Sequence, residues 1–256
     1  MGGLARRATF LRRFVQEHPG ASIFQVDAGA LFNHRAPDPL RSQILLEGVA
    51  KLGVEIMNLT PADARELERL GAAGKVKQPQ MVSANVLGAG RKTIAPPYAV
   101  RRARDGSRIV FIGLSSVSEH EAMGYMVESP QETLKRLLPQ IRQGAELVVL
   151  LAYMPNREVV DIAVNQPGVD VIISAFEEQF AVAPYQIGHA WILQAQYEGR
   201  MVGHAALELS PEKKLEKLAP HHIVGLDATF ADEPEMAALV ARAKPAAAAA
   251  GGQKGQ

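Results

Sequence analysis

The chain has no cysteine among its 256 residues, which excludes disulfides, thiolate nucleophiles and cysteine-bound metal sites. It has no uncharged apolar run near the roughly 18 residues of a membrane helix, so we expect no membrane span. It also lacks an excess of either charge, because 28 Lys+Arg offset 27 Asp+Glu. We therefore expect no nucleic-acid partner. What is present is a 47% hydrophobic content, sufficient to bury one full domain core.

Helical and extended patterns alternate along the chain, which indicates an α/β protein. Helix starts are marked by Asp38-Pro39 and Thr60-Pro61, and by a capping box that opens at Ser129. Asp105-Gly106 predicts a hairpin turn. The expected helices cover residues 4–15, 38–52, 60–70, 129–143, 156–164 and 233–243. The expected strands cover residues 23–28, 54–59, 81–86, 98–103, 108–114, 147–151, 169–173, 190–196, 201–209 and 223–226.

The region 147–173 predicts a βαβ unit, because two near-continuous apolar runs flank a helical segment. In α/β proteins, functional side chains gather in loops at the carboxyl ends of such strands. We therefore expect any site of this chain at residues 27–30, 59–65, 152–153 and 174–178.

Residues 146–209 form a strand, a helix, a strand and then a strand pair that turns at Glu198-Gly199. This order resembles the second half of the calcineurin-like metallophosphoesterase domain of the 5'-nucleotidase family. Ser83-Ala84-Asn85-Val86 and the segment from Leu193 to Gly203 resemble further motifs of that family, although Gln196 stands where a glycine is usual.

The resemblance covers most of residues 2–230 and implies a fold. That fold is a four-layer α/β/β/α sandwich, with two sheets packed face to face and helices outside. The family's first strand, which carries an Asp-x-His motif, has no counterpart before Gly2, so we expect a truncated domain with its N-terminal strand missing. We expect the phosphoesterase-like domain at 1–230, a C-terminal helix at 231–243 and an Ala/Gly-rich tail or linker at 244–256.

The resemblance also locates the family's chemical positions, and most are occupied by residues unsuited to that chemistry. The family's metal-ligand positions fall on Ala30, Pro61, Tyr153, Phe176 and Glu178. Its catalytic positions fall on Ala62 and Arg65. We therefore expect no catalytic residues, no metal and no cofactor, and interpret the chain as a non-catalytic structural or binding module. If Tyr153 and Phe176 meet, the former metal cleft becomes an aromatic pocket.

Two alternatives remain open at this stage. One is a metal-dependent phosphoester hydrolase in which Asp63, Glu178 and His34 hold Mn, Zn or Ca. Against it, Asp63 falls in the first turn of a helix, Asp27 is suited to capping a turn, and Glu177 and Glu178 suit a solvated surface. The other is a fragment that folds poorly because an open sheet edge promotes aggregation.

The remaining histidines give no clear ligand set. His221 and His222 are adjacent, so on a strand they point to opposite faces. His120, His189 and His204 are scattered along the chain.

The resemblance implies nucleotide catabolism and a periplasmic or extracellular location. No signal peptide precedes Gly2, so the chain is expected in the cytoplasm if Met1 is the genuine start. The expected partner is an unknown ligand or another domain of a longer chain. Full-length relatives grip the nucleoside base between aromatic rings of a separate C-terminal domain, and this chain has only 5% aromatic residues.

Overall fold

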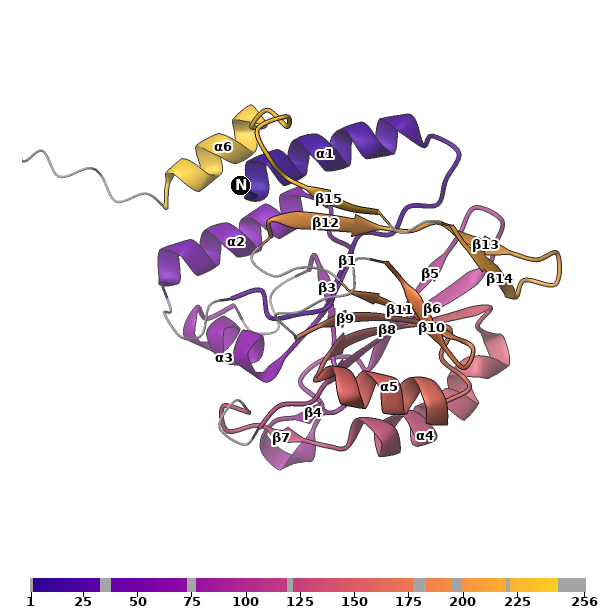
Figure 1. Cartoon of the computed structure of the whole chain (residues 1–256). Helices are drawn as coiled ribbons and strands as arrows, with labels where there is room; N and C mark the ends of the chain where they lie inside the picture. Colours follow the sequence, from indigo (N-terminus) through magenta and orange to yellow (C-terminus); the bar gives the residue numbers. More distant parts are fainter. Residues whose placement is uncertain are drawn as a thin grey trace, which may run out of the picture.

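The computed structural model describes residues 2–32, 38–72, 77–118, 122–176, 183–194, 199–219 and 222–243, and it is a mixed α/β fold (Figure 1). The helices are α1 (Leu4–Glu17), α2 (Pro39–Lys51), α3 (Pro61–Arg69), α4 (Pro130–Ile141), α5 (Asn156–Asn165) and α6 (Pro234–Ala241), with short 3-10 turns η1 (Ala89–Arg91) and η2 (Arg142–Gly144). The strands are β1 (Val26–Asp27), β2 (Ile56–Asn58), β3 (Gln80–Val82), β4 (Val86–Leu87), β5 (Tyr98–Arg102), β6 (Arg108–Ser115), β7 (Met126–Val127), β8 (Leu147–Tyr153), β9 (Val171–Ala175), β10 (Tyr185–Ile187), β11 (Ala190–Gln194), β12 (Met201–His204), β13 (Leu207–Leu209), β14 (Leu215–Leu218) and β15 (His222–Gly225).

The larger sheet has six strands in the order β10-β11-β9-β8-β6-β5. Its four inner strands are parallel, and the two edge strands pair antiparallel to them. The smaller sheet, β1-β2-β3, is parallel throughout. The two sheets face each other across a common apolar core to which Ile56 and Val82 contribute from one sheet and Phe111, Val149 and Leu151 from the other.

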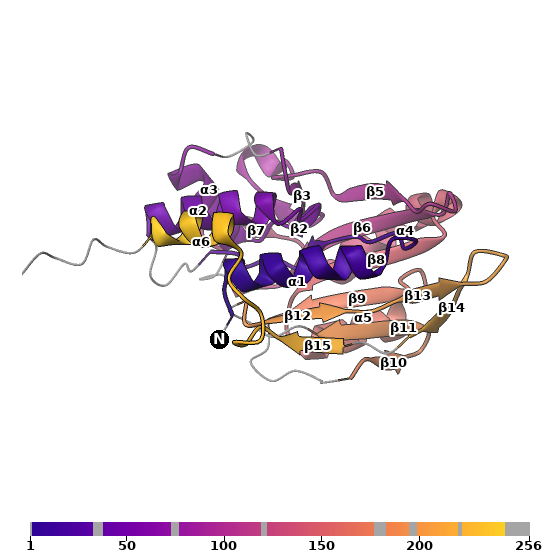
Figure 2. The same ribbon diagram turned by 90° about the horizontal axis from the view of Figure 1, so that it is seen from above.

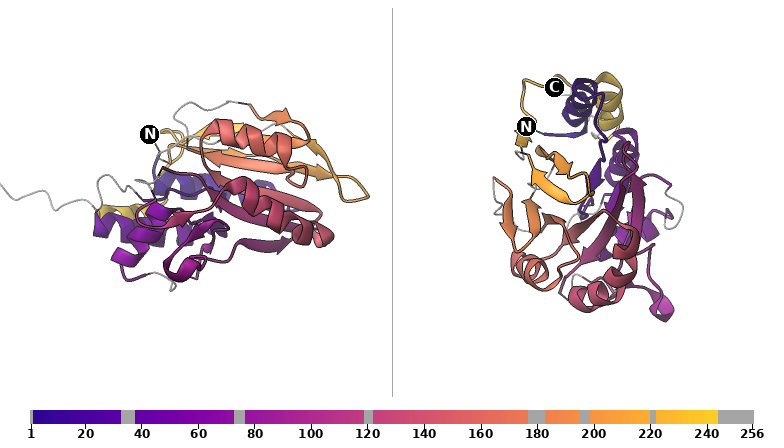
Figure 3. Two further views of the ribbon diagram at one scale, coloured as in Figure 1. Left: turned by 90° about the horizontal axis from the view of Figure 1, so that it is seen from below. Right: turned by 90° about the vertical axis from the view of Figure 1, so that its right-hand side faces the viewer.

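Helices cover the outer faces of both sheets. Leu134 of α4 and Ile162 of α5 pack on Leu150 and Ile172 of the larger sheet. On the other side, α1, α2 and α6 pack together through residues that include Ile44. The layers therefore follow the order helix, sheet, sheet, helix (Figure 3), which confirms the expected α/β/β/α sandwich.

Helix α1 connects the two ends of the described chain. The amide of Gly2 donates to the carbonyl of Leu226 at 2.7 Å, and the amide of Glu233 donates to the carbonyl of Ala5 at 3.2 Å. The rings of Phe10 and Phe230 meet edge to face with centroids 5.8 Å apart. Helices α1 and α6 consequently lie side by side, with α1 next to the ribbon of β12 and β15 and α6 over α2 (Figure 2).

The predicted capping residues are confirmed. The side chain of Asp38 accepts from the amides of Leu40 and Arg41, and those of Thr60 and Ser129 cap α3 and α4 in the same way. Asp105-Gly106 turns the antiparallel pair β5–β6. Among the described residues, no helix combines the length and apolar character that a membrane crossing requires.

Two predicted strands are wrong in extent. Residues 201–209 do not form one strand, because β12 pairs with β15 whereas β13 pairs with β14. Residues 81–86 are likewise split into β3 and β4, and Asn85 between them bonds across to Ser115 of β6. The short strands β7, β10 and β14 were not expected, since each has at most four residues.

Candidate functional site

The carboxyl ends of the parallel strands of both sheets lie at the same end of the sandwich, which is called the site edge below. Asn58 joins the two sheets there. This residue ends β2 and is fully buried. Its Nδ2 donates to the carbonyl of Ala28 at 3.1 Å and to the carbonyl of Leu114 at 2.9 Å. Asn58 thus ties β1 and β2 to the end of β6, where Leu114 is in register with Ala152 of β8 and, through it, with Ser174 of β9.

Asp63 is the buried carboxylate of this edge, with 0% of its surface exposed. Its Oδ2 accepts hydrogen bonds from the amide of Ala30 at 2.9 Å and from Oγ1 of Thr60 at 2.8 Å. Its Oδ1 accepts from the amide of Phe32 at 3.2 Å. Burial raises the pKa of Asp63 to about 6, and the three hydrogen bonds oppose that shift only in part.

The turn after β1 is built to approach Asp63 closely. Gly29 has φ of 103°, and a Cβ there would lie 2.7 Å from Cγ2 of Thr60. Ala30 follows in the left-handed region with φ of 61°. Oδ1 of Asp27 accepts from the amide of Gly29 at 3.0 Å, which confirms the expected turn cap.

The other residues of α3 at predicted site positions either lack a side-chain atom that could bind a metal or lie on the exposed face of the helix. Pro61 and Ala62 occupy the first turn of α3, as does Asp63. Arg65 lies on the exposed face of α3, where Nη1 is 3.3 Å from the carboxylate of Glu68. The predicted alternative ligands His34 and Glu178, together with Glu177, lie outside the described residues.

Tyr153 and Phe176 meet, which is the condition that the sequence left open. Their ring centroids are 5.1 Å apart with the planes at 67°, an edge-to-face arrangement. The parallel pairing of β8 and β9 brings them together, since Tyr153 is in register with Ala175. Both rings are half-buried at the carboxyl ends of these two strands.

An amide cluster on the helix-covered face of the larger sheet was missed by the sequence reasoning. Oδ1 of Asn156, the first residue of α5, accepts from Oη of Tyr185 at 3.0 Å and from Nε2 of Gln194 at 3.2 Å. Asn156 follows the end of β8, and Gln194 ends β11. A polar residue at the end of an apolar strand was the available signal for Gln194, because buried polar groups need partners.

The rings of Tyr153 and Phe176 offer aromatic surface at the carboxyl ends of β8 and β9. Among the residues that the structure describes, no group of three or more His, Cys, Asp or Glu is placed to hold a metal ion. Ala30, Pro61 and Phe176 have no donor atom in their side chains.

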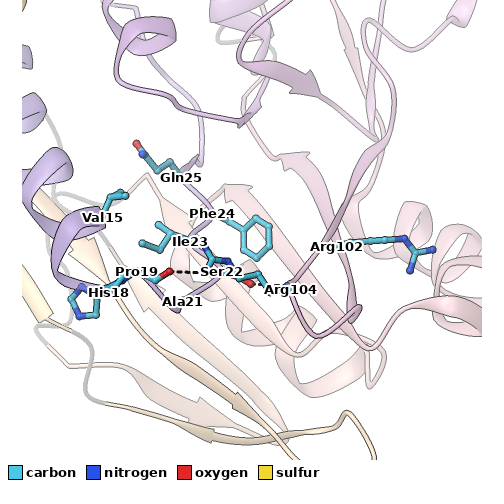
Figure 4. A pocket seen from close by; sticks show the side chains of 10 residues that line it. All are labelled: Val15, His18, Pro19, Ala21, Ser22, Ile23, Phe24, Gln25, Arg102 and Arg104. Carbon is cyan, nitrogen blue, oxygen red and sulfur yellow. Dashed lines mark hydrogen bonds between the residues drawn. The ribbon is translucent and has the colours of Figure 1, made fainter.

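A separate cavity of about 350 Å³ lies at the amino end of β1, away from this edge (Figure 4). The guanidinium of Arg104 donates to the carbonyl of Pro19 at 2.6 Å, and its amide donates to Oγ of Ser22 at 2.8 Å. The side chain of Arg102 points away from the other lining residues (Figure 4). Arg104 therefore anchors the loop that follows α1, and the cavity contains none of the predicted site residues.

No profile of a known protein family matches the sequence, and no curated protein matches it either. Solved structures do share its fold. The sulfate thiohydrolase SoxB of Thermus thermophilus superposes with a TM-score of 0.82 at 18% identity, covering 94% of this chain and 46% of that one. A 5'-nucleotidase precursor, also from Thermus thermophilus, gives 0.74 at 20% identity, with 94% and 52% covered. The calcineurin-like phosphoesterase YfkN of Bacillus subtilis gives 0.72 at 17% identity, with 94% and 88% covered.

The chain thus has the fold of calcineurin-like phosphoesterases and 5'-nucleotidases, as the sequence resemblance implied. It spans about half the length of the first two of these structures.

Proposed function

We propose that this chain is a non-catalytic phosphoesterase-like domain that acts as a binding module. The edge-to-face contact of Tyr153 and Phe176 is the observation that carries the proposal. The resemblance assigns both positions to metal ligands, and the two rings there pack against each other. A two-cation phosphoesterase site needs a cage of carboxylates, imidazoles and amides at this place.

The surroundings of Asp63 support the same conclusion. This carboxylate accepts three hydrogen bonds from the turn after β1 and from Thr60. A cation at Asp63 would compete with these donors for the same two oxygens, and each buried donor left unsatisfied costs about 1–3 kcal/mol. The described donors therefore do not fit a pair of divalent cations, and Asp63 fits a structural role.

The ligand class follows from the chemistry of the edge. Tyr153 and Phe176 offer aromatic surface at the carboxyl ends of β8 and β9. Such a surface suits a ligand with a flat aromatic face, such as a nucleobase or an aromatic side chain of a neighbouring domain. Hydrolysis is not part of this role.

The test compares turnover, metal content and binding in one preparation. Protein purified without chelator is incubated with Mn, Zn and Ca, analysed for bound metal, and assayed with p-nitrophenyl phosphate and 5'-AMP. We expect no turnover above that of the Asp63→Asn variant. Adenosine and N-acetyltyrosine amide are then titrated by NMR, and we expect shifts at the edge that a Phe176→Ala variant loses.

Turnover that requires Mn or Zn and disappears in a folded Asp63→Asn variant would contradict the proposal. It would instead support the metal-dependent hydrolase, with Asp63, Glu178 and His34 as the ligands to examine next. Absence of adenosine and tyrosine binding in a cooperatively folded sample would remove the binding role and leave a structural one.

A further inference from the structure

Two histidines far apart in the sequence face each other across the ribbon of β12 and β15. His204 and His222 are register partners in this antiparallel pair. Their ring centroids are 5.2 Å apart, with the planes at 31°. The sequence, in which His204 is one of several scattered histidines, gave no sign of this neighbour, because a cross-strand partner is unknown until the pairing is known.

Aromatic side chains of helix α1 pack against His204 of this pair. The ring of Phe14 lies 4.7 Å from the ring of His204 and 4.3 Å from that of His18. Phe10 also contacts His204, at 6.2 Å between ring centroids. These contacts restrict the ring of His204, which is half-buried, whereas His222 is exposed to solvent. An entering ion would therefore reach the pair from the side of His222.

The spacing suits a shared transition-metal ion. Metal–nitrogen bonds to imidazole are about 2.0–2.1 Å, and a ring centroid lies about 1 Å behind its nitrogen, so rings with centroids up to about 6 Å apart can share one cation. The observed 5.2 Å falls within that reach. Each imidazole has two nitrogens, so a ligand role leaves the second nitrogen to keep a hydrogen bond.

We propose that His204 and His222 form a two-histidine site for a late divalent transition metal. Imidazole ligands favour Zn²⁺, Ni²⁺ and Cu²⁺ over Mg²⁺ or Ca²⁺. No third His, Cys, Asp or Glu joins the pair among the described residues, so water completes the coordination. The site lies under α1 and is distinct from the edge that carries Tyr153 and Phe176. Its metal links β12 to β15 and thereby fixes the surface on which α1 packs.

The test is a Zn²⁺ titration of the untagged, unmutated protein followed by the histidine Cε1–H resonances in NMR. The chain has seven histidines. We expect the resonances of His204 and His222 to shift together and saturate at one Zn²⁺. Zn²⁺ at about 100 times its dissociation constant should raise the unfolding temperature by roughly 5–10 °C. Mg²⁺ at the same concentration should change neither readout.

Glutamine variants assign the site. His204→Gln and His222→Gln should each weaken Zn²⁺ binding by at least about tenfold, because even outer-shell partners of a metal contribute about 10–100-fold. The matched control is His189→Gln, since His189 is exposed in the turn between β10 and β11. Unchanged affinity in both of the first two variants, or shifts confined to other histidines in the unmutated protein, would overturn the proposal.

This outcome is separable from that of the phosphoesterase assay. A single Zn²⁺ that is lost in His222→Gln and supports no turnover belongs to the histidine pair. If the protein instead binds two metal ions and turns over substrate, and both properties are kept in His222→Gln, the metals are bound at the edge that carries Asp63.

Discussion

The carboxylate of Asp63 in α3 accepts a hydrogen bond from the backbone amide of Ala30 at 2.9 Å, although Ala30 belongs to the turn after β1, 33 residues earlier. The resemblance assigns Ala30 to a metal-bridging carboxylate. In this chain a carboxylate from α3 holds the backbone of that position instead. The turn after β1 is therefore held in place by a protein hydrogen bond, and no cation is needed to do so.

Replacing Asp63 by Asn should destabilise the protein even though it removes a buried charge. The two oxygens of Asp63 accept from Ala30, Phe32 and Thr60, whereas an amide offers one acceptor oxygen and turns an NH₂ toward the remaining donors. We expect a loss of about 1–3 kcal/mol in the free energy of unfolding, measured in urea at pH 7. Equal or higher stability would show that these hydrogen bonds do not hold the turn.

Asp63 should also make the stability depend on pH in a definite direction. Its pKa is raised from the usual 3.8 to about 6 in the folded state, so the folded protein takes up this proton first as the pH falls. The stability that Asp63 contributes is therefore fully present only below the unfolded pKa of 3.8 and is lost as the pH rises through 6. We expect the free energy of unfolding to gain about 2 kcal/mol from this group between pH 7 and pH 4. A carbon-13 NMR titration of its Cγ should give a midpoint near 6. A midpoint below 4 would refute this.

Gly113 should not tolerate a methyl group. A Cβ at this position of β6 would lie 2.4 Å from the carbonyl oxygen of Val82 and 2.6 Å from Oδ1 of Asn58. The two sheets would have to separate, so we expect Gly113→Ala to cost about 1–3 kcal/mol or more. The control is Gly225→Ala, where a Cβ meets nothing within 4 Å. Thermal unfolding of both variants tests the difference, and similar losses would argue against close approach of the sheets.

The aromatic pair should show a measurable coupling energy. A double-mutant cycle with Tyr153→Leu and Phe176→Leu isolates the contact from the burial of each ring. We expect a coupling of about 0.5–1.5 kcal/mol, typical of edge-to-face rings. Additive losses within experimental error would mean that the rings do not interact in solution.

Much of the architecture was predictable because local signals and burial agree. The apolar run of β8 is buried along nearly its whole length, and Asp38, Thr60 and Ser129 cap the helices that they were expected to start. The break between β12 and β13 was not predictable. Both segments have extended, partly apolar patterns, and the break arises only because their partners, β15 and β14, differ.

The sequence predicted where in the fold the candidate site lies, but only some of the residues and contacts that form it. The expected βαβ unit placed Tyr153 and Phe176 after neighbouring strands, but only the structure shows that their rings touch. The bonds of Asp63 to the amides of Ala30 and Phe32 did not follow, since a backbone donor leaves no mark in the sequence. The pairing of His204 with His222 could not be predicted for a similar reason, because the register of two strands is set by the whole sheet.

Helix α1 has a consequence for the order in which the chain folds during synthesis. Arg6 bonds to the carbonyl of Leu226, and the two residues are 220 positions apart. At about 5–20 residues per second, a ribosome needs roughly 10–40 s to add the segment between them. Through that interval α1 has emerged, but the ribbon of β12 and β15 and helix α6, which cover part of its apolar face, do not yet exist. A helix near the start of this sequence is therefore fully packed only late, and a nascent chain halted before β12 should present α1 to chaperones and proteases.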